Sequence, residues 1–182
     1  MNRRTSILDH QINAPDVLAQ ALMDDGIFPN SRLPLLVYRH AVTLPEQDPA
    51  ALFEELFAAN GYCGSWRNGV YPYHHYHSTA HEVLGVYAGH AKLQFGGDDG
   101  VVHDVKAGDV ILIPAGVAHK KLDASKDFSV VGAYPDGRDW DLNYGKPGER
   151  PDTDCNIARV PVPKKDPIYG EHGPLLERWE HG

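Results

Sequence analysis

Three histidines and one glutamate of the chain have the side-chain types and the spacing of metal ligands. His75 and His77 are separated by one residue, and Glu82 follows five positions after His77. Because residues i and i+2 of a β-strand project from the same face, a strand here would aim both imidazoles at one point. A carboxylate at the start of the next strand can join them, and His119 follows a Pro/Gly turn at residues 114–116. Imidazole and carboxylate ligands suit a borderline divalent metal ion.

Two stretches around these residues resemble the two motifs of the cupin family. The first motif is a glycine, five residues, His-x-His, four residues, Glu, six residues and a glycine, and residues 69–89 fill every position. The second motif is a glycine, five residues, Pro-x-Gly, two residues, His, three residues and usually Asn. Residues 108–123 fill it except at the last position, where Asp123 replaces the asparagine. The matching positions are Gly69, His75, His77, Glu82, Gly89, Gly108, Pro114, Gly116 and His119.

The end of the chain extends this resemblance. Residues 159–175, with Trp179 after them, are similar to the ending of the bacterial YjlB-type cupin subfamily, and so is the His-His-Tyr-His form of the first motif. The resemblance implies the cupin fold, a double-stranded β-helix or jelly-roll barrel, with a metal held by the three histidines and the glutamate. It implies no substrate, because the subfamily carries no reaction that can be transferred.

Three imidazoles and one carboxylate leave one or two positions open on a metal that takes five or six ligands. Those positions can hold water, a bidentate substrate or dioxygen, so the metal can act as a Lewis acid or exchange electrons with oxygen. The ligand set does not choose among iron, manganese, nickel, zinc and cobalt. Because a free imidazole has a pKa of about 6.5, we expect acidification below about pH 6 to release the metal.

Short β segments separated by turn residues fill the middle of the chain and predict an all-β core. Many short strands with this punctuation fit a jelly-roll barrel, whose interior can hold a metal and one small ligand. A further strand, residues 33–39, is expected at or near a sheet edge because it contains a proline. The other expected strands are residues 70–76, 82–88, 91–95, 101–105, 109–113, 118–122 and 128–134.

The segments outside the barrel are expected to extend it within one structural domain. Apolar stripes predict helices over residues 13–22 and 49–59. With a loosely docked arm before them, these helices make an N-terminal extension over residues 1–60, packed on a barrel at residues 61–135. The Pro- and Gly-rich tail, residues 136–182, is too long for a casual linker and is expected to wrap the barrel or cross a dimer interface.

Strand alternation around the first motif predicts further pocket residues. If the His-x-His pair faces inward, Tyr73 and Tyr71 do so too, whereas His74 and Tyr76 face the opposite side. The two tyrosines either line the pocket or fill the barrel. On the following strand, Leu84 shares the face of the glutamate and gives the site an apolar wall.

Residues near and after the second motif are further candidates for substrate contacts. If the strand alternation continues after His119, the side chains of Lys121 and Asp123 also face inward. Lys121 is the nearby cation that could meet an anionic substrate, the alternative being a solvated lysine at a strand end. Trp140 and Tyr144, just past the last strand, either stand at the pocket rim or fix the tail. His81 is expected at the surface, because it cannot share the direction of its neighbour Glu82 on a strand.

Composition narrows the classes of partner. The 182 residues have a formal net charge of −8 and no basic run, which argues against nucleic acids and anionic membranes. No apolar stretch of about 18 residues predicts a membrane span, and the start lacks the apolar region of a secretory signal. Cys63 and Cys155 are expected to be free thiols in a cytoplasmic protein. The edge strand and the long tail favour a homodimer.

Two functions of different class remain. The first is a metal-dependent enzyme acting on a small organic molecule, such as a dioxygenase or an isomerase, which the complete ligand set supports. The second is a non-catalytic module that senses or binds a small molecule, because no general base besides the ligands can be named. The sequence has no Gly-x-Ser-x-Gly and no phosphate-binding loop, which disfavours hydrolases of those kinds. The lack of a DNA-binding helical domain argues against a transcription factor.

Overall fold

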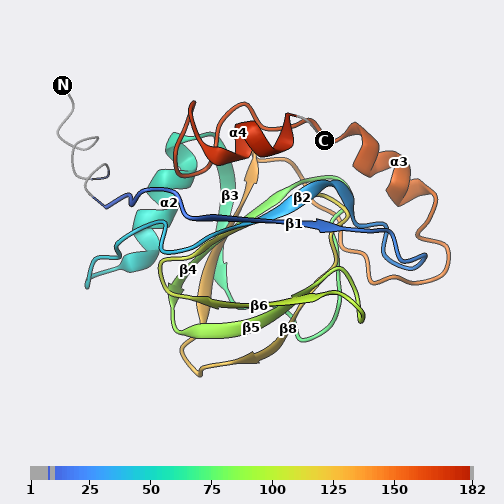
Figure 1. The fold of residues 1–182 in the computed structure, drawn as a ribbon, viewed down its shortest axis with the longest axis horizontal. Coiled ribbons are helices and arrows are strands. Elements are labelled where there is room, and N and C mark those ends of the chain that lie inside the picture. Colours follow the sequence, from blue (N-terminus) through green and yellow to red (C-terminus); the bar gives the residue numbers. More distant parts are fainter. Residues whose placement is uncertain (1–7, 9–10, 181–182) are drawn as a thin grey trace.

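The computed structural model describes residue 8 and residues 11–180 of the chain. In this part of the chain, nine strands form two antiparallel sheets that lie opposite each other (Figure 1). The larger sheet has the strand order β1-β2-β7-β4-β9-β3, and the smaller has the order β6-β5-β8. The expected all-β core is therefore confirmed. The strands are β1 Val17–Leu22, β2 Ser31–Tyr38, β3 Tyr62–Asn68, β4 Glu82–Ala88, β5 His90–Phe95, β6 Val101–Lys106, β7 Val110–Ile113, β8 His119–Ala124 and β9 Ser129–Pro135.

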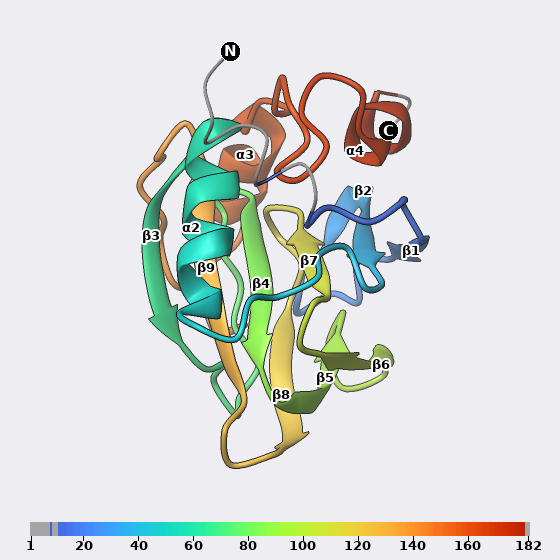
Figure 2. The same cartoon turned by 90° about the vertical axis from the view of Figure 1, so that its left-hand side faces the viewer.

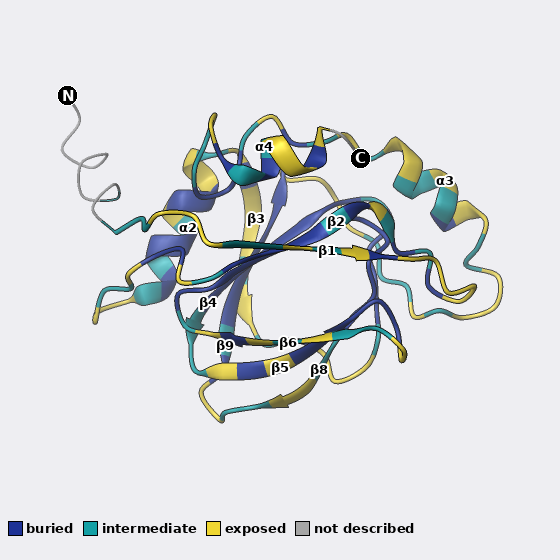
Figure 3. Ribbon diagram, in the orientation of Figure 1, coloured by how far each residue is buried: buried dark blue, intermediate teal, exposed yellow. Residues whose placement is uncertain are grey.

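The central strands of the larger sheet are buried on both faces. Along β2, Leu35 and Val37 belong to the core between the two sheets, whereas Leu36 belongs to a second core on the outer face. All three side chains are fully buried, and β2, β4 and β9 are largely dark blue in Figure 3. A strand with both faces covered carries apolar residues without alternation, which explains why β2, β7 and β9 are almost wholly apolar.

Helix α2, Pro49–Ala59, covers the outer face of the larger sheet, over β3, β4 and β9 (Figure 2). The sequence predicted this helix, and the structure confirms its bounds. Its Phe53 and Phe57 rings lie 5.5 Å apart and are fully buried. Gly85 of β4 gives Phe53 its room, because a Cβ atom at this position would lie 2.5 Å from the Phe53 ring.

The C-terminal tail packs on the same outer face through Ile168, Leu175 and Trp179. It contains two helices that were not predicted, α3 Asp152–Arg159 and α4 Pro174–Trp179. Trp179 is buried, and its Nε1 donates a hydrogen bond to the Pro34 carbonyl in β2, at 2.9 Å. Asp166, also fully buried, accepts hydrogen bonds from the Tyr38 hydroxyl and from three backbone N–H groups of the tail.

The expected helix over residues 13–22 is wrong, because this segment contains strand β1. Leu18 and Leu22 are four residues apart, a spacing that puts two side chains on one side of a helix and also on one side of a strand. Pairing with β2, in which Leu18 lies opposite Val37, decides for the strand. Strands β1 and β2 thus belong to the larger sheet, so the sheet does not begin at residue 61. The expected N-terminal arm lies mostly outside the described residues.

The expected strand at residues 70–76 is also wrong. Strand β3 ends at Asn68, and Gly69 and Pro72 interrupt the extended pairing that follows. Only two single bridges occur here, from His75 to His119 and from Tyr76 to Asn143. The other six expected strands of the barrel each match an observed strand to within two residues. We call residues 69–81 the ligand loop.

Candidate metal centre

The ligand loop and two strands bring the candidate ligands together. His75 exchanges two backbone hydrogen bonds with His119, the first residue of β8, at N–O distances of 3.2 and 3.0 Å. This bridge fixes the loop against β8 and sets the two imidazoles side by side. Glu82 is the first residue of β4 and directly follows the loop. One short loop therefore joins two of the candidate histidines to the candidate carboxylate.

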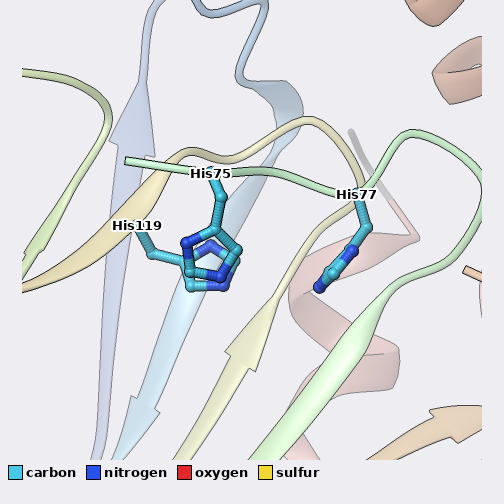
Figure 4. A group of neighbouring side chains, drawn as sticks. All are labelled: His75, His77 and His119. Carbon is cyan, nitrogen blue, oxygen red and sulfur yellow. The ribbon is translucent and has the colours of Figure 1, made fainter. Parts of the chain in front are cut away.

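Three imidazoles converge on a common space (Figure 4). His75, His77 and His119 are buried, and each offers one ring nitrogen that lies within 4.8 Å of the other two. The ring centroids of His75 and His119 are 4.1 Å apart, and that of His77 lies 5.9 Å from each. Such a buried cluster of nitrogen donors is able to hold a metal ion.

Each of the three imidazoles is oriented by a backbone carbonyl. The Nδ1 atoms of His75 and His119 lie 3.1 and 3.0 Å from the carbonyls of Tyr73 and Val117. The His77 Nδ1 lies against the carbonyl of Asp141. A ring that donates Nδ1–H to a carbonyl keeps the lone pair on Nε2, which is the arrangement of metal-ligating histidines. The donor set therefore fits a divalent metal ion.

Glu82 stands beside this cluster. Its Oε2 lies 3.4 Å from Nε2 of His77, and its Oε1 lies 3.5 Å from Nε2 of His119. The Tyr134 hydroxyl donates a hydrogen bond to Oε2 at 3.0 Å, and Trp66 Nε1 donates to that hydroxyl at 2.8 Å. Sequence reasoning missed Tyr134 and Trp66. Alternation along the expected strand at residues 128–134 could have put Tyr134 on the inner face.

The electrostatics keep two of these groups in the form that binds a metal. Burial, helped by the nearby His119, lowers the pKa of His75 to about 3, so this imidazole stays neutral. Burial alone would raise the pKa of Glu82, but His77 and His119 hold it below its usual range. Burial would lower the pKa of His77, and the Glu82 carboxylate reverses this and raises it.

Comparison with known proteins assigns the family. The sequence matches the model of the cupin domain over residues 67–127. It is 45% identical over 157 residues to the uncharacterized protein YjlB of Bacillus subtilis (strain 168), covering 86% of this chain and 92% of that protein. The chain is a YjlB-like cupin. The resemblance seen in the sequence motifs is thereby confirmed.

Solved structures similar to this cupin are distant in sequence. The match to a double-stranded β-helix protein from Klebsiella pneumoniae covers 75% of this chain and 93% of that protein, at 15% identity and a TM-score of 0.35. It matches the epimerase RmlC of Legionella pneumophila at 15% identity and a TM-score of 0.38, covering 68% and 74% of the two chains. The match to pumpkin seed globulin has 24% sequence identity and a TM-score of 0.37, and it covers 44% of this cupin. The cupin spans about a fifth of that globulin's length, 22%.

A cavity of about 360 Å³ opens at the three imidazoles of this cupin. It combines the candidate ligands with apolar side chains, aromatic rings and two cationic side chains. The lining residues are Trp66, Arg67, Asn68, Gly69, Val70, Tyr71, Pro72, His75, His77, Glu82, Leu84, His119, Lys121, Tyr134 and Trp140.

The five residues expected to contact a substrate divide into two groups. Tyr71, Lys121 and Trp140 line the cavity. Tyr73 and Tyr144 are not among the residues that line it in the described part of the chain. The Tyr73 ring stacks on Tyr71 with 5.0 Å between centroids, and Tyr144 lies 5.8 Å from Tyr73. Tyr73 thus packs against a residue of the cavity wall, and Tyr144 packs against Tyr73.

The expectation that Asp123 faces inward is wrong. Leu93 of β5 lies opposite Lys121, but its neighbour Lys92 lies opposite Asp123, so Leu122 is an extra residue in β8. Such a bulge reverses the alternation beyond it. Asp123 is exposed and lies beside Lys92, outside the cavity, while Lys121 keeps the side of His119.

The expectation that His81 is exposed is also wrong. Its side chain is buried, its Nδ1 accepts a hydrogen bond from Ala115 N at 2.9 Å, and its ring lies 4.9 Å from that of Trp179. His81 therefore links the Pro/Gly turn before β8 to the C-terminal helix. The helix that covers it, α4, was not visible as a helix in the sequence.

Outside the cavity, the structure describes both cysteines and the character of the helices. Cys63 and Cys155 are both free, as expected, and both are exposed. None of the helices in the described residues has the length and apolar character needed to cross a lipid bilayer.

Proposed function

We propose that this cupin is a metal-dependent enzyme that acts on a small organic molecule, as a dioxygenase or an isomerase does. The observation that carries the proposal is the convergence of three carbonyl-oriented imidazoles on one cavity. His75, His77 and His119 would hold the ion, and Glu82 would be the fourth ligand. A bound metal supplies Lewis acidity or, if iron or manganese, electron exchange with oxygen. Iron, manganese, nickel, zinc and cobalt all fit this donor set.

The remaining cavity residues would bind and orient the substrate. A cavity of about 360 Å³ lies at the small end of ligand pockets, which run from about 300 to 1,000 Å³. Val70 and Leu84 give it an apolar wall, and Tyr134 holds the carboxylate of Glu82 in place. The substrate is therefore a small molecule with an apolar part.

A second candidate is a non-catalytic module that binds or senses a small molecule. It is favoured by one observation: within the described cavity wall, the imidazoles and carboxylates are all candidate ligands. The described cavity wall thus offers no further imidazole or carboxylate as a general base, and the Tyr134 hydroxyl already donates to Glu82.

Elemental analysis of the protein, purified without chelator and without added metal, tests the proposal. Near-stoichiometric transition metal supports it. Iron or manganese would direct the search to substrate-dependent oxygen uptake, and zinc or nickel to isomerase assays. Protein that contains no metal and takes up none on titration would overturn the metal centre and leave the binding module.

Two further expectations belong to the proposal, a cytoplasmic location and a homodimer. Free, exposed thiols at Cys63 and Cys155 suit a reducing compartment. Edge strand β1 and the exposed Met23 and Ile27 beyond it offer a surface for a second copy. Sedimentation or light scattering of the purified chain measures the oligomeric state.

A further inference from the structure

Lys121 is the charged residue of the cavity wall that lacks an ion-pair partner among the residues that the structure describes. The other cation, Arg67, is bound to Glu54 and lies 3.0 Å from an Asp48 oxygen. The backbone N–H of Lys121 donates to the Tyr71 carbonyl at 2.9 Å, which fixes its place on β8. Lys121 is half-buried, and an ammonium without a carboxylate partner is free to bind an anion.

Lys121 shares a side of β8 with His119. The register against β5 is regular between them, with Phe95 opposite His119 and Leu93 opposite Lys121. Residues two apart on a strand have Cα atoms separated by about 7 Å and side chains on one face. Lys121 and His119 therefore line the same cavity from one face of β8.

The charge of the loaded site would also favour an anion. A divalent ion with three neutral imidazoles and the Glu82 carboxylate has a net charge of +1. Lys121 adds a second positive charge, and within the described cavity wall no further carboxylate opposes it. This step rests on the proposed function, because it counts the metal.

Two of the aromatic side chains that line the cavity are also exposed. Tyr71 and Trp140 are 47% and 46% exposed, unusually high for rings of this size. The Tyr71 ring lies edge-on to His75 at 5.1 Å, and the Trp140 ring lies edge-on to His77 at 5.2 Å. Each ring thus stands beside one candidate ligand, where it can contact the apolar body of a bound molecule.

We propose that the cavity binds a small carboxylate with a planar, aromatic-sized body. The carboxylate pairs with Lys121, and the body lies between Tyr71 and Trp140, next to the three imidazoles. Lys121 is then the residue that selects anionic over neutral molecules of the same shape.

Titration calorimetry with three probes tests this inference: benzoate, the neutral benzamide and the ringless acetate. Each is titrated into the whole chain, loaded with metal and separately treated with chelator, and metal content is measured on the same samples. For the wild type we expect benzoate to bind at least about tenfold more tightly than either of the others. Lys121→Met removes the preference for benzoate over benzamide in the chelator-treated protein and reduces it in the metal-loaded protein, whose site keeps a net charge of +1. Lys121→Arg keeps the wild-type preference in both.

Lys120→Met is the matched control. Lys120 is the neighbouring residue on β8, but its ammonium lies 3.4 Å from Asp98, outside the cavity. We expect this variant to bind benzoate as the wild type does. Metal-loaded Lys121→Met that binds benzoate unchanged overturns the inference, and so does wild type that binds benzamide or acetate equally well. Protein that takes up no metal instead refutes the proposed function, so the two failures are distinguishable.

Discussion

The phenol of Tyr134 donates a hydrogen bond to the carboxylate of Glu82, with 3.0 Å between the two oxygens. Both side chains are buried, and Trp66 in turn donates to the phenol oxygen. Glu82, the carboxylate among the candidate ligands, is therefore held by Tyr134 of β9, which is itself held by Trp66 of β3. These two strands lie at one edge of the larger sheet.

Tyr134→Phe is expected to weaken metal binding without unfolding the barrel. Loss of a hydrogen bond that orients a ligand typically lowers metal affinity by about ten- to a hundredfold. A competition titration against a chromophoric chelator measures this change. Tyr62→Phe is the matched control, because the Tyr62 hydroxyl binds the Lys165 carbonyl in the tail, away from the cavity. Equal affinities in the two variants would show that the phenol does not position Glu82.

Removal of single ligands is expected to lower metal occupancy. We expect His77→Ala and Glu82→Ala each to lose most of the bound metal while circular dichroism shows a folded barrel, because each leaves an incomplete donor set. His74→Gln is the control, because the His74 ring points to the opposite side and lies 5.3 Å from Phe28. Full occupancy in both ligand variants would place the metal elsewhere.

The free energy of unfolding of the chelator-treated protein is expected to decrease as the pH is lowered from 6.5 to about 4, partly because of His81. Burial lowers the pKa of His81 from 6.5 to about 4, so in this range the unfolded chain binds a proton that the folded chain does not. Stability therefore rises with pH through this window, by on the order of 3 kcal/mol for a shift of this size.

Urea denaturation at several pH values measures this contribution. His81→Gln should show a shallower dependence of the unfolding free energy on pH than the wild type. His90→Gln, at an exposed position of β5, should keep the wild-type dependence. Parallel curves for all three proteins would contradict the role of His81.

Asp166→Asn is expected to destabilise the protein by about 2 kcal/mol, the scale of hydrogen bonds to a charged group. The amide nitrogen cannot accept the bonds that the Asp166 oxygens take from the Tyr38 hydroxyl and the tail backbone. Urea denaturation measures the loss. Glu171→Gln, which removes only an exposed ion pair with Lys165, should change stability little. A similar small effect of Asp166→Asn would mean that the tail is held by other contacts.

Much of the site could be predicted because most of its residues are close in the sequence, so the local backbone determines where their side chains lie. His75 and His77 needed only one residue between them, and Glu82 needed only to begin the next strand. The three imidazoles converge although the ligand loop is not a strand, and isolated bridges at His75 and Tyr76 hold this part of the loop. The cavity residues on β8 were predicted as far as Lys121, and the bulge at Leu122 ended the agreement.

The rest could not be predicted because it depends on contacts between distant segments. Strand β1 was predicted as a helix because the spacing of its leucines fits the period of a helix as well as that of a strand. Its pairing with β2 makes it a strand. The burial of His81 depends on Trp179, nearly a hundred residues later in the chain. The partner of Glu82, Tyr134, is fixed by the register between β4 and β9, which leaves no local signature.

The ring of His77 is oriented by a residue of the tail, and this limits how the protein can be divided. Asp141 accepts from His77 through its carbonyl, and its carboxylate accepts from Ser78 N and Asn143 Nδ2 at 2.6 and 2.9 Å. The first motif and the tail are therefore one unit for protein engineering. A barrel grafted as residues 61–135 alone would carry every histidine of the cluster into a new host, but one of the three would arrive without the group that aims it.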